Sequence, residues 1–199
     1  MKFQIIAGEL CLDFINTLDN RNVPERIEEL VPSYGDLLEW AMQAGALSSR
    51  QGKLLLKESE NHPKQAAAIR DQAANLRECL YRMFTALARG QKVAPDDLSI
   101  LNGYVSEAQS HLELQAAPDG FRLDWCEPRR LDFVLWQIVR SATQLLTGGD
   151  LEKLRECGED TCRWLFIDRS KNHSRRWCDM KICGNRFKAR RFYQKQSRT

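Results

Sequence analysis

Four cysteines near the C-terminus have the spacing of a metal site. They form two pairs, Cys157-x4-Cys162 and Cys178-x4-Cys183, and fifteen residues separate the pairs. Thiolates suit zinc because it is a borderline-soft cation that accepts four sulfur ligands in a tetrahedron. Four cysteine ligands leave no coordination position for water, so such a site is structural rather than catalytic. We therefore predict one structural Zn²⁺ bound by these four residues.

Disulfides and free thiols are the alternatives for this cluster. The short apolar run at the N-terminus meets Glu9 and Asp13, and no small-residue cleavage site of a secretory signal follows it. We therefore expect a cytoplasmic protein whose thiols stay reduced. The remaining cysteines, Cys11, Cys79 and Cys126, are scattered in apolar contexts, and we expect them to be small buried hydrophobic residues.

The segment that contains the cysteine pairs is strongly basic. Residues 151–199 contain 14 basic and 6 acidic residues, whereas residues 1–150 contain 16 and 21. From Arg169 to Thr199 there are 11 basic residues and one acid, Asp179. A basic segment on a mildly acidic body is typical of proteins that bind a polyanion. We predict two domains, 1–150 and 151–199, with nucleic acid as the partner of the second.

Lysine and arginine side chains of this segment are the candidate nucleic-acid contacts, because each neutralised phosphate releases counterions. Arginine also suits bidentate recognition of guanine. We expect Arg186 and Arg190 to contact bases, since they project from the start of the last predicted helix. The expected phosphate contacts are Arg169, Lys171, Arg175, Arg176, Lys188, Arg191 and Lys195. Double-stranded DNA is the favoured partner, and RNA is an alternative. A further alternative is that the basic segment binds no nucleic acid and is a charged tail exposed to water.

The elements around the cysteines must hold these side chains in place. The segment is too short to bury a core of its own, so zinc is expected to keep it folded. Trp164, Phe166 and Trp177 should pack around the metal, and Asn185 can cap a final helix. We expect a zinc knuckle followed by this helix. Zinc removal should then unfold the chain after about Leu151 and leave the N-terminal helices intact.

Residues 1–150 are predicted to form a mainly helical domain. Apolar residues recur at alternating spacings of four and three along residues 63–89, which predicts one long amphipathic helix. The turn Pro118-Asp119-Gly120 lies between alternating apolar residues and predicts a β-hairpin. Further helices are expected at residues 9–18, 33–44, 95–112 and 129–147 and from about residue 48, with a short strand at residues 3–6.

Three polar residues near the end of the first predicted helix suggest a second kind of site. Asn16, Thr17 and Arg21 follow an apolar stretch and could line a pocket for a small ligand. Helix capping and loop hydrogen bonds are the alternative for these side chains, and we favour that alternative.

The stretch from Cys157 to Tyr193 resembles the CGNR zinc finger, which is named for the sequence that is here Cys183-Gly184-Asn185-Arg186. The surrounding pattern agrees at Phe166, Asp168, the run from Ser170 to Cys178, Met180 and Lys188. The resemblance implies a zinc-binding finger. It implies DNA binding through the same basic residues that the charge distribution indicates.

The N-terminal part is similar to the ABATE domain, which usually precedes this finger. The similarity lies in the sequence GELCLDFINT at residues 8–17, in Arg21, and in the sequence DLLEW at residues 36–40. Together the two resemblances cover nearly the whole chain. They imply a mainly helical domain followed by a finger, in a bacterial, stress-linked transcription regulator.

Several classes of protein are not expected. The sequence has no P-loop, G-x-G-x-x-G, G-x-S-x-G or H-E-x-x-H motif. None of its three histidines has a neighbouring nucleophile or paired carboxylate that would suggest a catalytic site, so we expect no enzyme. The longest run without a charged side chain is ten residues, against roughly 20 for a membrane helix, so we expect no membrane partner.

The favoured hypothesis is a DNA-binding transcription regulator whose N-terminal domain senses a ligand or oligomerises, and a homodimer is compatible with it. The alternative is a ligand-binding or protein-interaction module, or an RNA binder, whose finger mediates partner contacts.

Overall fold

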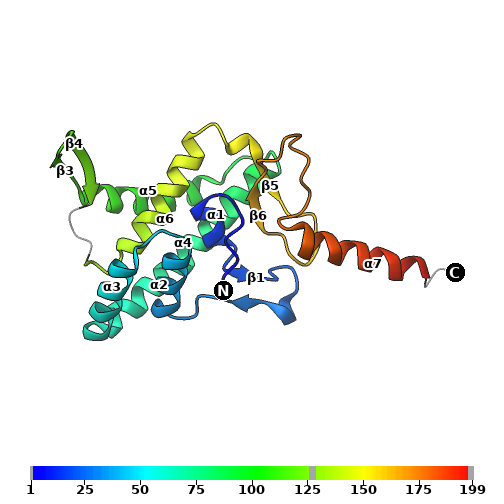
Figure 1. The fold of residues 1–199 in the computed structure, drawn as a ribbon, viewed down its shortest axis with the longest axis horizontal. Helices are drawn as coiled ribbons and strands as arrows, with labels where there is room; N and C mark the ends of the chain where they lie inside the picture. The colour runs from blue at the N-terminus through cyan, green and yellow to red at the C-terminus, as the bar shows by residue number, and fades with distance from the viewer. Residues whose placement is uncertain (1, 126–128, 197–199) are drawn as a thin grey trace.

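The computed structural model describes residues 2–125 and 129–196, and within these ranges the chain is mainly helical (Figure 1). The helices are α1 (Leu10–Ile15), α2 (Tyr34–Gln43), α3 (Ser49–Asn61), α4 (Pro63–Ala88), α5 (Pro95–Ser110), α6 (Phe133–Thr147) and α7 (Asn185–Gln196). The strands form the antiparallel pairs β1 (Leu18–Asp19) with β2 (Glu28–Glu29), β3 (Leu112–Ala117) with β4 (Gly120–Trp125), and β5 (Leu154–Glu156) with β6 (Leu165–Ile167). Short helical turns lie at Pro24–Arg26, Leu151–Lys153 and Met180–Gly184. The predicted fold class is confirmed.

Capping residues set the starts of α2 and α3. Ser33 accepts a hydrogen bond from the backbone N–H of Asp36, whose carboxylate accepts one from the backbone N–H of Ser33. Ser48 and Gln51 form the same reciprocal pair at the start of α3. These contacts satisfy backbone donors that the first turn of a helix leaves unpaired.

The long helix α4 supports most of the other helices. It begins at Pro63 and ends before Gly90, whose φ of 68° lies in the left-handed region that favours glycine. Its predicted apolar stripe is buried, for example at Leu76, Leu80 and Met83. Helices α1, α2, α3 and α5 all contact it, and α6 packs on α1 and α5.

The first helix is shorter than predicted. We expected residues 9–18, but α1 ends at Ile15 and Leu18 pairs with Glu29 in the β1–β2 ladder. The backbone N–H of Cys11, in the first turn, donates to the Ser141 hydroxyl of α6 at 3.0 Å. The short helix is therefore held by a neighbouring helix rather than by a side-chain cap of its own.

The expected strand at residues 3–6 does not form. Instead, the carboxylate of Asp13 accepts hydrogen bonds from the backbone N–H groups of Ile6 and Ala7 at 2.8 and 2.9 Å. The carbonyl of Ala7 in turn accepts from the backbone N–H of Ile167 in β6 at 2.8 Å. The N-terminal segment therefore links α1 to the C-terminal part of the chain.

The predicted hairpin forms from β3 and β4, with Leu114 opposite Leu123. It stands out from the helices at one end of the molecule, and α7 projects from the opposite end (Figure 1). Leu114, Phe121 and Leu123 are exposed on the hairpin.

One hydrophobic core runs from the helices into the C-terminal part. The rings of Phe14 and Trp40 lie 5.1 Å apart, and Phe166 of β6 is buried in the same cluster of residues. Cys11 and Cys79 are buried in it as predicted, whereas Cys126 lies outside the described residues. Strand β5 contacts α4, and β6 contacts α1. The change of charge between residues 150 and 151 therefore does not divide the core.

The buried Asp13 carboxyl makes stability depend on pH. Burial raises its pKa to about 6 from the ordinary 3.8, so the native state holds a proton that the unfolded chain loses between these values. The free energy of unfolding of the wild type should therefore fall as pH rises through about 4 to 6. Asp13→Asn keeps the acceptor oxygen and should remove this loss, worth about 2–3 kcal/mol at pH 7. Urea unfolding of both proteins from pH 4 to 7 tests this; a pH-independent difference would contradict it.

Candidate metal centre and nucleic-acid interface

The four cysteines of the predicted metal site converge. Cys157 follows β5, Cys162 lies in the turn before β6, Cys178 ends the next loop, and Cys183 lies in the turn before α7. All four are buried, and their sulfur atoms lie within 4.8 Å of one another. The Cys162–Cys178 and Cys178–Cys183 sulfur distances are 3.5 and 3.6 Å.

These distances fit zinc and not a disulfide. Sulfurs bound at about 2.3 Å around a tetrahedral zinc lie about 3.8 Å apart, whereas a disulfide joins sulfurs at about 2.05 Å. The donor set of four thiols, with no open position, matches a closed structural site. The chain therefore holds one structural zinc ion at Cys157, Cys162, Cys178 and Cys183.

Ionisation of these thiols depends on the metal. Hydrogen bonding from Cys162 holds the pKa of the Cys157 thiol well below its usual range. Contact with Cys157 raises the pKa values of the Cys162 and Cys178 thiols. Four thiolates this close repel one another, so without a cation some of them keep their protons. Zinc removes this conflict because it binds the thiolate form of all four.

Backbone hydrogen bonds shape the two halves of the site. The N–H of Cys157 donates to the carbonyl of Trp164 at 2.8 Å, which closes the β5–β6 pair. The N–H of Gly158 donates to the carbonyl of Arg176 at 2.8 Å, and a Cβ at Gly158 would lie 3.2 Å from that oxygen. The N–H of Cys178 points to the sulfur of Cys157 at 3.5 Å. These contacts bring the first cysteine pair to the second.

Two aspartates order the rest of the segment. Asp179, the one acid among the 11 basic residues after residue 168, accepts hydrogen bonds from the N–H groups of Lys181 and Ile182. The buried carboxylate of Asp168 accepts from the N–H groups of Ser170 and Arg175 at 3.0 and 2.8 Å. Each carboxylate satisfies backbone donors of a loop that has little regular structure.

The proposed ligand residues are engaged within the chain. The side-chain amide of Asn16 donates to the carbonyl of Leu165 at 2.9 Å and accepts from its N–H at 3.0 Å. Thr17 donates to the carbonyl of Phe14, and Arg21 forms two hydrogen bonds with the carboxylate of Glu78. The structure places these side chains in the contacts that we favoured over a ligand pocket.

The contact of Asn16 with β6 also changes the expected effect of zinc removal. Strand β6 lies on α1, and the indole N–H of Trp164 donates to the Asp19 carboxylate at 2.9 Å. Unfolding of the C-terminal part would uncover α1 and leave the amide of Asn16 without partners. We therefore expect chelation to loosen the helices around α1 as well.

Three of the candidate nucleic-acid residues hold the fold together. Arg169 pairs with Glu9 and Asp150. The guanidinium of Arg175 lies 4.6 Å from the centre of the Phe166 ring and donates to the carbonyls of Trp177 and Cys178. Arg190, one of the two expected base contacts, forms an ion pair with the fully buried Glu159. In this arrangement the donors of these arginines serve the protein itself.

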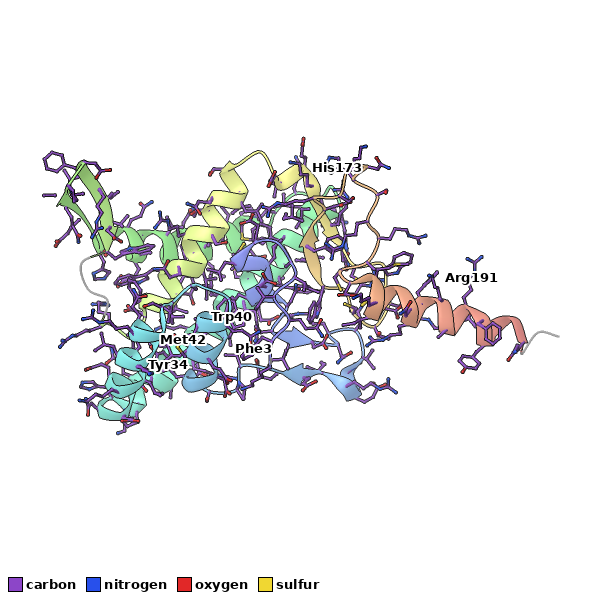
Figure 2. The ribbon with its side chains drawn as sticks, viewed as in Figure 1. Phe3, Tyr34, Trp40, Met42, His173 and Arg191 are labelled. Atoms are coloured by element: carbon purple, nitrogen blue, oxygen red, sulfur yellow. The ribbon has the colours of Figure 1, made fainter. Side chains whose placement is uncertain are left out.

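The other candidates face outward. Lys171, Arg176, Arg186, Lys188 and Arg191 are exposed, and the Lys195 side chain lies outside the described residues. Figure 2 shows Arg191 pointing away from the body on α7, and His173 at the outer tip of the loop before Cys178. The guanidinium of Arg186 donates to the Thr161 hydroxyl at 3.2 Å, so this exposed side chain also contacts the first half of the knuckle.

A surface hollow beside the zinc site adds a residue that sequence reasoning missed. It has a volume of about 360 Å³, and its walls include His173, Arg175, Arg176 and Arg155. Arg155 lies on β5, before the run of basic residues that starts at Arg169, and the hydrogen bond from Gly158 to the Arg176 carbonyl brings the end of β5 to this loop. The hollow is large enough for a phosphate group. Arg155 and Arg175 already donate to backbone carbonyls and Glu156 also lines the hollow, so Arg176 is its exposed arginine.

Comparisons with known families agree with this geometry. A model of the ABATE domain, described as "Putative stress-induced transcription regulator", matches residues 8–149. The chain belongs to the ABATE family. A second model, the CGNR zinc finger, matches residues 153–196, which include all four zinc ligands. No curated protein matches the chain.

The ABATE region and the CGNR finger thus meet near residue 150, although their core is shared. Among the described residues, no helix has both the length and the apolar character needed to cross a bilayer.

The ion pair between Arg190 and Glu159 is expected to contribute to the stability of the fold. Arg190→Met leaves the buried Glu159 carboxylate without its cation, so the free energy of unfolding should fall by about 2–3 kcal/mol. Arg191→Met, one position on and exposed, is the matched control and should change stability by less than about 0.5 kcal/mol.

Denaturant unfolding of the zinc-loaded proteins measures both effects. Adding Glu159→Gln to Arg190→Met should restore part of the loss, because it removes the buried charge. Equal stability of the two single variants would show that Arg190 is not a structural residue.

Proposed function

We propose that the chain is a DNA-binding transcription regulator that contacts double-stranded DNA through its CGNR finger. The observation that carries the proposal is the projection of α7 from the body with exposed cations along it (Figure 1). The family description names a transcription regulator, which supports the same reading. A cytoplasmic location and a role in binding rather than catalysis belong to this proposal.

The dimensions of α7 suit the major groove. An α-helix with its side chains is about 10–12 Å across, which fits a groove about 12 Å wide, and Asn185–Gln196 would extend about 18 Å along it. Arg186 lies in its first turn, where recognition helices commonly contact bases. Lys188 and Arg191 lie farther along the exposed surface and would contact phosphates.

Zinc supports this role through the position of the helix. Cys183 is a ligand two residues before α7 begins, and the Arg190–Glu159 pair joins the helix to the first half of the knuckle. Arg190 thus acts in the proposal as a support for α7, and Arg186 keeps the role of base contact. The hollow beside the site would hold a backbone phosphate near Arg176. A homodimer would place two fingers about 34 Å apart on two half-sites.

The exposed cations of α7 can be tested together. Substituting Arg186, Lys188 and Arg191 by Ala should lower affinity for duplex DNA about tenfold or more and reduce the salt dependence of binding. Each lost phosphate contact should reduce the slope of log K against log salt by about 0.9. The matched control substitutes Arg50, Lys53 and Lys57 of α3, which are also exposed, and should leave the slope unchanged.

Anisotropy titrations at several salt concentrations measure both triple variants. Selection from a randomised duplex pool then tests the role of Arg186: an enriched motif that Arg186→Ala abolishes supports base contact. Binding without enrichment would restrict the finger to phosphate contact. The same loss in both triple variants, or no retained DNA, would contradict the proposal and favour RNA or a protein as partner.

A further inference from the structure

A cavity lies between α5, α6 and the β3–β4 hairpin. The hairpin is at the end of the molecule opposite α7 (Figure 1). Its volume is about 240 Å³. Val105, Leu112 and Val139 supply aliphatic walls, and Trp125 and Trp136 supply aromatic ones. Such a mainly apolar cavity with few polar groups is the usual form of a small-molecule site.

A cation without an acidic partner stands at this cavity. Arg140 of α6 lines it, and the guanidinium lies 5.5 Å from the centre of the Trp125 ring. Within residues 2–125 and 129–196, Arg140 forms no ion pair, whereas Arg21, Arg77 and Arg82 are each paired with a carboxylate. An apolar wall with one unpaired guanidinium favours an apolar ligand that carries one negative charge.

A buried donor at the same cavity also lacks a partner. Trp136 is 2% exposed, and among the described residues its indole N–H has no hydrogen-bond acceptor. The indole N–H of Trp125, in contrast, donates to the carbonyl of Ala108 at 2.8 Å. The indole nitrogen of Trp136 is itself buried beneath the cavity wall, so its NMR signal would report a ligand against the Trp136 ring rather than a hydrogen bond to that ligand.

We propose that this cavity binds a small aromatic carboxylate. An apolar cavity of about 150 Å³ accommodates benzene, so 240 Å³ has room for one ring and a carboxylate. The ring would lie against Trp125 and Val139, and the carboxylate would accept hydrogen bonds from Arg140. This site is distinct from Asn16, Thr17 and Arg21, and it goes beyond the proposed contact with DNA.

Binding can be tested without DNA, so its failure is separate from failure of the proposed function. The probes are benzoate and phenylacetate, with benzamide and phenylacetamide as neutral counterparts of the same size. The zinc-loaded full chain is titrated up to roughly 10 mM probe, and the indole N–H signals are followed by NMR. We expect both acids to produce a saturable shift of the Trp136 signal, assigned with Trp136→Phe, while the signals of Trp164 and Trp177 stay in place.

Variants of an exposed residue separate charge recognition from folding. Arg140→Met should weaken binding of the acids about tenfold or more and leave binding of the amides unchanged. Arg140→Lys should retain part of the affinity. Arg122→Met, an exposed arginine of the hairpin that does not line the cavity, is the matched control and should bind as the wild type does.

Three results would overturn the proposal. The first is the absence of a saturable shift with either acid. The second is equal affinity for an acid and its amide. The third is unchanged binding of the acids by Arg140→Met.

Discussion

The binding of four thiolates to one zinc ion is the interaction on which the C-terminal part of the molecule depends. Cys157 follows β5 and Cys162 precedes β6, whereas Cys178 precedes the turn before α7 and Cys183 lies in it. After β6, the segment between the pairs has little regular structure, and the buried Asp168 carboxylate accepts hydrogen bonds from two of its backbone N–H groups. Zinc therefore sets both the position of β6 on the helical core and the direction in which α7 leaves it.

The structure of the C-terminal part divides its basic residues into two groups, one that contacts other groups of the protein and one that faces solvent. Arg169, Arg175 and Arg190 neutralise or bridge groups of the protein, and Arg190 does so against a carboxylate that is fully buried. The exposed cations of α7 and its neighbouring loop have their charges turned to solvent. A net positive charge in this segment thus includes a structural part, and only the remainder is available to a polyanionic partner.

Much of the fold and of the zinc site could be predicted from the sequence, and the predictions that were wrong or missing share a cause. The zinc ligands, the long helix α4, the helix predicted at residues 33–44 and the hairpin follow from local spacing, which a sequence displays. The roles of Arg190 and Asn16 depend on partners 31 and 149 residues away, and no local pattern encodes such pairs. The cavity at Arg140 likewise combines three separate elements. The expected strand at residues 3–6 failed because its donors found the Asp13 carboxylate instead of a neighbouring strand.

The central claim is that zinc folds a finger that completes the core of the helical region. Amide hydrogen exchange of the full chain, with zinc and after chelation, tests it most directly. We expect faster exchange on chelation in residues 154–196 and also in α1, while the end of the molecule that carries the β3–β4 hairpin is unaffected. Faster exchange confined to residues after 151, with α1 unchanged, would show that the finger folds independently and would contradict the account.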